Sequence, residues 1–252
     1  MIYNKNLWKD YLPVQTGENY APVEKSGILN IDKPTGLSSM DVIRIIRKIG
    51  KIKKVGHAGT LDPLATGVLP ILVNKATKLS ETLMSGSKEY DGTLIFGQEY
   101  DTQDITGTPI GKTSDLSPDI NLEFLKNAAS FYKGEIDQIP PIFSAIKKNG
   151  KPLYKYARSS QIVDIQTRKV FVDTFNIVEQ INSNTFSFYI SCGKGVYVRT
   201  LVHDLGIRVQ CPAALASLRR LRVGKFLFEN TVKLEHLKTP DDIIDRLISP
   251  EL

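Results

Sequence analysis

Residues 55–70 read VGHAGTLDPLATGVLP, a stretch rich in glycine, proline and small side chains. Its apolar residues favour burial, so it predicts an ordered loop and not a linker; they are Leu61, Leu64, Val68 and Leu69. Glycine lets a backbone approach another chain closely, and Pro63 stiffens the loop beside Asp62. A carboxylate held on such a loop can act as a nucleophile or a base, although Asp62 could also simply cap a turn.

The segment before this stretch predicts a strand, a turn and a helix. Residues 27–31 (GILNI) indicate a short buried strand, and the KPTG sequence that follows favours a turn. Residues 38–41 (SSMD) resemble a capping sequence, and apolar residues then recur at helical spacing. We therefore expect a helix over residues 39–49 with its apolar stripe inward. Its outward residues are expected to be Arg44, Arg47 and Lys48.

The other segments mix strands and helices without regular alternation or internal repeats. Residues 1–26 lack periodicity and predict an irregular N-terminal arm. Strands are expected over residues 90–96, 170–178 and 185–192. Helices are expected over residues 122–132, 198–209, 213–221 and 240–248. This pattern predicts an α+β fold, in which helices and loops flank a mixed, largely antiparallel sheet.

Composition narrows the classes of function. The chain has 252 residues, a formal net charge of +6 and 41% hydrophobic residues, which is typical of a globular protein. Its apolar runs are too short for a membrane span and its N-terminus lacks an export pattern, so we expect a cytoplasmic protein. Two cysteines and three scattered histidines predict neither a disulfide framework nor a zinc site. Any chemistry should rest on carboxylates, aromatic residues and arginines.

Basic residues gather in three parts of the chain, over residues 44–54, 147–169 and 219–225. Such clusters raise the local electrostatic potential and attract polyphosphate partners. Three solvated faces would give the same pattern, so charge alone leaves both interpretations open.

Seven ordered motifs resemble those of the bacterial tRNA pseudouridine-55 synthases, the TruB family. The sequence GHAGTLDPLATGVL from Gly56 resembles the family signature, and GILNIDKPTGLSSMDV from Gly27 resembles its first motif. The other matching motifs are Lys88-Glu89-Tyr90 and residues 97–107, 138–158, 192–206 and 218–226. The resemblance implies a catalytic domain over residues 27–230 and a short helical tail over residues 231–252.

The resemblance also implies an activity. The chain is expected to isomerise the T-loop uridine of tRNA to pseudouridine, with no cofactor and no metal. Asp62 matches the nucleophile of the family, and Arg199 matches the arginine that pairs with this carboxylate. Tyr90 matches the tyrosine that stacks on the target base and helps to remove the C5 proton. Without the resemblance, Arg199 would be interpreted as a surface helix residue.

Further residues match positions that bind substrate. His57 matches the histidine that enters the T loop where the target base is flipped out, although it could instead form a local hydrogen bond. Tyr197 and Leu218 match residues that line the pocket of the target base. Either residue could instead belong to the hydrophobic core. Basic residues expected on the RNA-binding surface are Arg44, Lys48 and Lys147 or its neighbour Lys148. Residues expected to shape the fold are Lys33, Pro34, Gln138, Pro140 and Pro141.

The sequence departs from the family pattern in three places. Tyr100 stands where the family usually has threonine, and residues 1–26 have no clear counterpart. The chain ends at Leu252, where familiar members continue into a C-terminal RNA-binding domain of the PUA type, so we expect that domain to be missing. The expected partner is the T arm and loop of tRNA, bound by a monomer without an obligatory protein partner. Two alternatives stay open, a tRNA-folding chaperone and a guide-RNA-dependent pseudouridine synthase.

Overall fold

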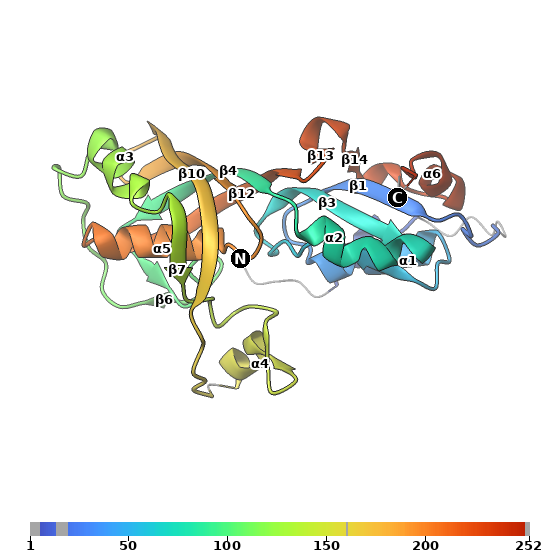
Figure 1. Ribbon diagram of the computed structural model, residues 1–252, viewed down its shortest axis with the longest axis horizontal. Helices are drawn as coiled ribbons and strands as arrows, with labels where there is room; N and C mark the ends of the chain where they lie inside the picture. The colour runs from blue at the N-terminus through green and yellow to red at the C-terminus, as the bar shows by residue number, and fades with distance from the viewer. Residues whose placement is uncertain (1–5, 14–19, 160, 250–252) are drawn as a thin grey trace. The chain divides into compact units, whose positions relative to one another are not determined.

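The computed structural model describes residues 6–13, 20–159 and 161–249 (Figure 1). The chain forms two compact units. Unit 1 comprises Met1–Tyr90 and Leu218–Leu252, and unit 2 comprises Asp91–Ser217. Within the described ranges, no helix has the length and apolar character that crossing a membrane requires. Both units combine strands with helices, which confirms the predicted α+β class.

Unit 1 is built on a mixed sheet in the strand order β14-β1-β3-β12, with β2 added to β3 and β13 to β12. Its strands are β1 (Gly27–Lys33), β2 (Val55–His57), β3 (Thr66–Val73), β12 (Ala213–Val223), β13 (Phe226–Leu227) and β14 (Val232–Lys233). Its helices are η1 (Leu7–Tyr11), α1 (Ser39–Ile49), η2 (Asn74–Leu79), α2 (Ser80–Met84), η3 (Phe228–Asn230), η4 (Leu234–His236) and α6 (Pro240–Asp245), where η marks a 3₁₀ helix. Strand β3 pairs antiparallel with β1 and parallel with β12.

Helix α1 confirms the prediction for residues 39–49. Ser38 caps its first turn, because the Ser38 side chain accepts from the backbone N–H of Asp41 while the Asp41 carboxylate accepts from the N–H of Ser38. The apolar stripe is buried, and it includes Val42, Ile45, Ile46 and Ile49. The three basic residues of the opposite side are exposed, as expected: Arg44, Arg47 and Lys48.

Unit 2 holds strands in the order β12-β4-β11-β10-β7, and both β12 and β4 contribute residues to both units. Its other strands are β4 (Lys88–Phe96), β5 (Glu99–Tyr100), β6 (Pro109–Ile110), β7 (Gly134–Gln138), β8 (Lys147–Lys148), β9 (Lys151–Pro152), β10 (Arg168–Gln180) and β11 (Thr185–Cys192). Its helices are α3 (Leu122–Ser130), α4 (Leu153–Arg158) and α5 (Val198–Arg208). Strand β10 pairs antiparallel with both β11 and β7. The antiparallel pairs bear out the prediction of a mixed, largely antiparallel sheet.

The core of unit 2 follows the alternation of β11. Phe186, Phe188 and Ile190 are buried, as the sequence predicts for one face of this strand. The Phe96 ring meets Phe186 edge-on, with ring centres 5.9 Å apart. Phe175 of β10 meets Phe188 in the same way at 6.0 Å. These aromatic contacts join three neighbouring strands into one packed layer.

Three predicted elements need correction. Residues 213–221 form strand β12 and not a helix, because sheet pairing outweighs the helical propensity of their Ala, Leu and Arg residues. Both ends of the predicted loop over residues 55–70 are strands, β2 and β3, which pair with each other. The last helix ends at Asp245, short of residue 248. Of the expected N-terminal arm, residues 1–5 and 14–19 lie outside the described ranges, as do residues 250–252 of the expected tail.

Candidate active site

Asp62 lies on the loop that joins β2 to β3 in unit 1. The two strands pair antiparallel, with His57 opposite Ile71. Asp62 follows β2 and precedes β3 in the chain, and its side chain is half-buried. Gly59 and Gly67 flank the carboxylate with φ angles of +100° and +95°. L residues that carry a side chain rarely adopt positive φ angles of this size. Gly59 and Gly67 are therefore required for the path of the backbone around Asp62.

Hydrogen bonds from the turn before α1, and from its first residue, fix the backbone on both sides of Asp62. The N–H of Gly36 donates to the carbonyl of Pro63 at 2.8 Å. The Ser39 hydroxyl accepts from the N–H of Leu61 at 2.9 Å and donates to the carbonyl of Leu61 at 3.1 Å. The residues directly before and after Asp62 are thus both held, which restricts where its carboxylate can point.

Arg220 of β12 is a second support, which the sequence prediction missed. Its side chain is buried, and the residue is 1% exposed. The guanidinium donates from Nε to the carbonyl of Val68 at 2.8 Å, and from its two terminal nitrogens to Thr60 at 3.2 Å and Gly59 at 3.1 Å. One planar group therefore connects the backbone before Asp62 to the strand that follows it.

The basic cluster over residues 219–225 is consequently not a single solvated face. Arg220 points inward, while Arg222 donates to the Glu89 carboxylate from Nε at 2.8 Å and from a terminal nitrogen at 2.5 Å. Period-two alternation would have placed the neighbours Arg219 and Arg220 on opposite faces if the segment had been assigned as a strand, and Arg219 is indeed exposed while Arg220 is buried.

Lys33 is the second buried cation beside the Asp62 loop, and it is 0% exposed. Its ammonium donates to the carbonyl of Leu37 at 2.6 Å and of Pro34 at 2.8 Å. Burial lowers the pKa of Lys33 to about 7, and the negative charge of Asp62 is the strongest influence that opposes this fall. An ionised Asp62 therefore favours the charged form of Lys33. The expectation that Lys33 shapes the fold agrees with these contacts.

His57 ends strand β2 and is half-buried. Its carbonyl accepts from the Ser80 hydroxyl at 3.2 Å. Its Nδ1 is buried, and among the described residues no hydrogen-bond partner is found for this atom. Burial lowers the pKa of His57, and the positive charge of Arg220 lowers it further. The imidazole is therefore neutral near neutral pH and presents an uncharged planar ring.

Arg199 lies in the first turn of α5 in unit 2 and is only 3% exposed. Its terminal nitrogens donate to the carbonyl of Phe143 at 2.7 Å and of Thr102 at 3.1 Å. The guanidinium also lies 5.9 Å from the centre of the Tyr197 ring. These contacts replace the interpretation of Arg199 as a surface helix residue, because its side chain ties two loops to α5.

Gln138 holds Tyr197, the residue that precedes α5. Its side-chain amide donates to the Tyr197 carbonyl at 3.1 Å, and its side-chain carbonyl accepts from the Tyr197 N–H at 2.8 Å. Gln138 is 2% exposed, so both bonds are shielded from water. This two-way contact agrees with the structural role expected for Gln138, and it fixes the backbone next to Arg199.

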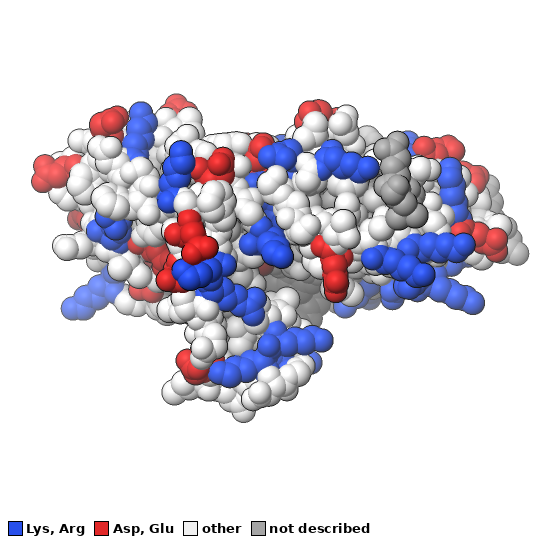
Figure 2. Space-filling view, in the orientation of Figure 1, with Lys and Arg blue, Asp and Glu red and all other residues white. Residues whose placement is uncertain are grey.

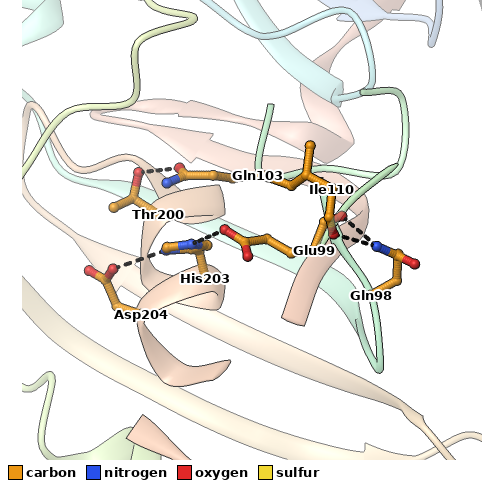
Figure 3. Close-up of polar contacts among 7 residues, drawn as sticks. All are labelled: Gln98, Glu99, Gln103, Ile110, Thr200, His203 and Asp204. Atoms are coloured by element: carbon orange, nitrogen blue, oxygen red, sulfur yellow. Dashed lines mark hydrogen bonds and ion pairs between the residues drawn. The ribbon is translucent and has the colours of Figure 1, made fainter. Parts of the chain in front are cut away.

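Polar side chains of α5 also reach the acidic segment over residues 97–107 (Figure 3). His203 lies 3.2 Å from the Glu99 carboxylate, and the Thr200 hydroxyl donates to Gln103 at 2.8 Å. Tyr100, which departs from the family pattern, lies in the short strand β5 beside this contact. The described ranges contain no group of three or more His, Cys, Asp or Glu side chains placed to hold a metal ion.

The remaining candidate residues divide between the units. Tyr90 is 6% exposed, and the half-buried Leu218 accepts at its carbonyl from Thr66 at 3.4 Å. Unit 1 contains Asp62, His57, Tyr90, Leu218, Arg44 and Lys48. Unit 2 contains Arg199, Tyr197 and Lys147. The pairing of Asp62 with Arg199 stays a prediction.

The basic surface is less open than the sequence suggests. Arg44 forms an ion pair with the buried Asp41, and Lys148 forms one with Asp164. Lys147 is exposed on β8. Figure 2 shows basic side chains gathered on the segment that carries α4. The basic residues of this segment are Lys147, Lys148, Lys151, Lys155 and Arg158.

Comparisons with known proteins agree with this architecture. The model described as TruB family pseudouridylate synthase (N terminal domain) matches residues 47–198, and that of the tRNA pseudouridylate synthase B C-terminal domain matches residues 199–251. A tRNA pseudouridine synthase B of Geobacter sulfurreducens is 42% identical over 229 residues, which cover 89% of this chain and 74% of the relative. A tRNA pseudouridine synthase B of Staphylococcus aureus is 39% identical over 217 residues, which cover 84% of this chain and 71% of the relative.

Solved structures share the fold. A chain of a Cbf5-Nop10-Gar1 complex matches with a TM-score of 0.64 and 29% identity, covering 84% of this chain and 53% of that chain. A chain of an H/ACA RNP bound to a substrate RNA matches with a TM-score of 0.61 and 27% identity, and the match covers 52% of it. The present chain thus spans about half the length of these solved chains. The fold and the matches define an RNA pseudouridine synthase. The chain belongs to the TruB family.

Proposed function

We propose that the protein converts the T-loop uridine of tRNA, at position 55, to pseudouridine. The observation that carries the proposal is the support of Asp62: hydrogen bonds fix the residues on either side of it, and buried Arg220 holds the loop to β3. Preorganisation of this kind is what a reacting carboxylate needs. The relatives at about 40% identity carry the name of this activity.

The proposed chemistry balances without an added reagent. Asp62 attacks the target nucleoside, the bond between N1 and C1′ breaks, and the detached uracil turns in the pocket. C5 then bonds to C1′ as the bond between Asp62 and the nucleoside breaks, which regenerates the carboxylate. C5 loses its proton while N1 gains one, so the product is an isomer of the substrate. We assign to Tyr90 the stacking on the base and the help in removing the C5 proton. Arg199 is assigned to pair with the Asp62 carboxylate.

His57 is assigned to the T loop itself. A flipped base leaves a gap in the stack, and a neutral planar ring can fill this gap without bringing a charge between bases. Burial and Arg220 both lower the pKa of His57 and keep the ring neutral. Tyr197 and Leu218 are proposed as walls of the base pocket.

RNA recognition is proposed to rest on phosphate and shape contacts. The exposed residues Arg44, Lys48 and Lys147 are the proposed contacts, within a T arm bound by a monomer. We further propose that residues 27–230 form the catalytic part, preceded by the arm over residues 1–26 and followed by the tail over residues 231–252. A tRNA-modifying enzyme of this kind would act in the cytoplasm.

A guide-RNA-dependent activity is the second candidate, and one observation bears on it. The chain resembles a chain of an H/ACA RNP at 27% identity, but the curated tRNA pseudouridine synthases B are closer in sequence, at 39–42%. Activity on a bare tRNA transcript would contradict dependence on a guide. A chaperone role is tested by tRNA refolding with Asp62→Asn, because an independent chaperone would keep its refolding activity in that variant.

The central test is site-resolved mapping of pseudouridine in a tRNA transcript incubated with the purified protein. The wild-type chain is expected to modify the T-loop uridine. Asp62→Asn is expected to lose this activity while tRNA binding in a gel-shift assay persists. Turnover of Asp62→Asn at the wild-type rate would exclude Asp62 as the nucleophile, and wild-type modification at another site alone would exclude the proposed target.

A further inference from the structure

The described part of the N-terminal arm, over residues 6–13 and 20–26, lies beside the basic side of α1. Its short helix η1 carries Trp8, and the Nζ of Lys48 lies 5.1 Å from the centre of one of the indole rings. This separation is within the range of a cation–π contact. Further along the arm, the Nζ of Lys51 donates to the carbonyl of Tyr20 at 2.7 Å. Two lysines of the basic cluster over residues 44–54 thus hold the arm at two points.

The arm also reaches the turn that supports the Asp62 loop. A Cβ atom built on Gly36 would lie 2.8 Å from Cδ2 of Leu7, so Leu7 packs directly on this turn. The N–H of Gly36 donates in turn to the carbonyl of Pro63, the residue after Asp62. A single turn of the chain therefore connects the arm to the loop that carries the carboxylate.

The exposed side of α1 is suited to a polyanion. The structure describes this helix in full, and its exposed residues are Met40, Arg44, Arg47 and Lys48. Three of these four are basic, and the only acid of the helix, Asp41, is buried. The Trp8 side chain, which covers one end of this side, keeps part of its surface accessible. An aromatic ring beside a cation is the combination on which single-stranded bases stack.

We infer that Trp8, backed by Lys48, is a stacking platform for an unpaired nucleotide of the substrate RNA. The inference rests on the proposed function, since RNA that presents a nucleotide to Asp62 must pass near the turn on which Leu7 packs. Stacking at this distance from the carboxylate adds affinity and takes no part in the chemistry. Its loss is therefore expected to raise KM rather than to lower kcat.

The chain offers a direct probe, because Trp8 is its only tryptophan. Titration of the Asp62→Asn protein with the tRNA transcript is expected to change the tryptophan fluorescence in a saturable way. The midpoint should match the midpoint of a gel shift under the same conditions. Unchanged fluorescence over a titration in which the gel shift reaches saturation would overturn the inference.

Substitutions give the second readout. Trp8→Ala is expected to raise the KM for tRNA by about 5- to 150-fold, the range for losing one stacked base. Trp8→Phe is expected to restore most of the affinity because it keeps a ring. Phe131→Ala is the matched control, since Arg208 lies 3.5 Å from the centre of the Phe131 ring and forms the same kind of pair in unit 2. Equal KM values for Trp8→Ala and the wild type would refute the platform.

Two further outcomes keep this inference separate from the proposed function. If Trp8→Ala unfolds, Lys48→Gln replaces it, and a smaller salt dependence of tRNA binding is expected, whereas an unchanged slope and affinity would refute the role of Lys48. A wild-type protein that binds tRNA with a fluorescence change but forms no pseudouridine would refute the proposed function and leave the platform standing. A wild-type protein that forms pseudouridine, together with a Trp8→Ala variant of unchanged KM, would support the proposed function and refute the platform.

Discussion

Arg220 is the residue whose position says most about how Asp62 is held. Three of its hydrogen bonds reach backbone carbonyls on both sides of the carboxylate. Arg220→Lys keeps the charge but replaces a planar fork by a single ammonium, which cannot reach all three carbonyls. We expect the single-turnover rate to fall about tenfold or more, because a slightly misplaced carboxylate loses alignment with the nucleoside.

The matched control for Arg220→Lys is Arg222→Lys, at the partly exposed ion pair with Glu89. This variant is expected to keep the single-turnover rate within about threefold of the wild type. Rates are compared by rapid quench at saturating tRNA, and gel shifts report the affinity of each variant. A fall in affinity with an unchanged rate for Arg220→Lys would show that Arg220 serves RNA binding and not the placement of Asp62.

The sequence predicts some of these residues much better than others. Glycine and proline around Asp62 indicate an ordered loop, and the structure bears this out with two positive φ angles. Charge patterning alone cannot distinguish an arginine that faces water from one that donates to buried carbonyls. Arg220 therefore escaped prediction as a support, and the partners of Lys33 could not be named, because the partners of both are backbone atoms that leave no mark in the sequence.

Gly67 gives a second prediction at the scale of one residue. A Cβ atom at Gly67 would lie 2.3 Å from the carbonyl oxygen of Arg220, where β3 and β12 approach each other. Gly67→Ala is therefore expected to lower the free energy of unfolding by about 3 kcal/mol or more. Gly111→Ala is the control, since Gly111 also has a positive φ, +69°, but open space around it. Its expected cost is only about 1 kcal/mol, and equal losses in urea unfolding would contradict the packing argument.

At the scale of elements, helix α1 and strand β12 show what decides whether the sequence predicts an element correctly. The apolar stripe of α1 and its cap point to one structure, so the local pattern was sufficient. Residues 213–221 read locally as a helix, but β12 pairs with β3 and β13. Ala213 also packs at the end of α5, where a Cβ on Gly206 would lie 2.6 Å from the Ala213 nitrogen. Small residues here serve close packing, which propensity does not record.

The contact between α5 and β5 predicts a pH-dependent stability. His203 lies 3.4 Å from Asp204 and 3.2 Å from Glu99, and these carboxylates raise its pKa although burial opposes them. The folded state thus binds the proton more tightly than the unfolded chain. The stabilisation is complete below the ordinary pKa of histidine and is lost as the pH rises through the raised value.

We therefore expect His203→Gln to lower the free energy of unfolding by about 1 kcal/mol near pH 5.5, allowing for screening at the partly exposed Glu99. Near pH 8.5 the difference from the wild type should be about zero to 0.5 kcal/mol. Urea unfolding at both values measures it, with His236→Gln at an exposed position as the control. A difference that grows as the pH rises would contradict the assigned sign.

At the scale of the whole molecule, the net charge of +6 sets a general attraction to RNA, and the local ion pairs decide which cations contribute to it. Lys148 and Lys169 lie beside carboxylates, at Asp164 and Glu135. Each such pair cancels part of the field that a phosphate would meet. The sequence could predict the total charge and the clusters, but the pairs depend on strands that meet only in the fold.

Lys147 and Lys169 turn this argument into a measurement, because both substitutions to Gln remove one positive charge. Lys147 is exposed on β8, whereas Lys169 lies 2.9 Å from Glu135 and 3.9 Å from Asp137. If Lys147 contacts a phosphate, Lys147→Gln should reduce the slope of log affinity against log salt by about one. Lys169→Gln should change this slope much less. Fluorescence or gel-shift titrations of tRNA at four or more salt concentrations give both slopes, and equal changes would show that net charge, and not the local arrangement of cations, governs binding.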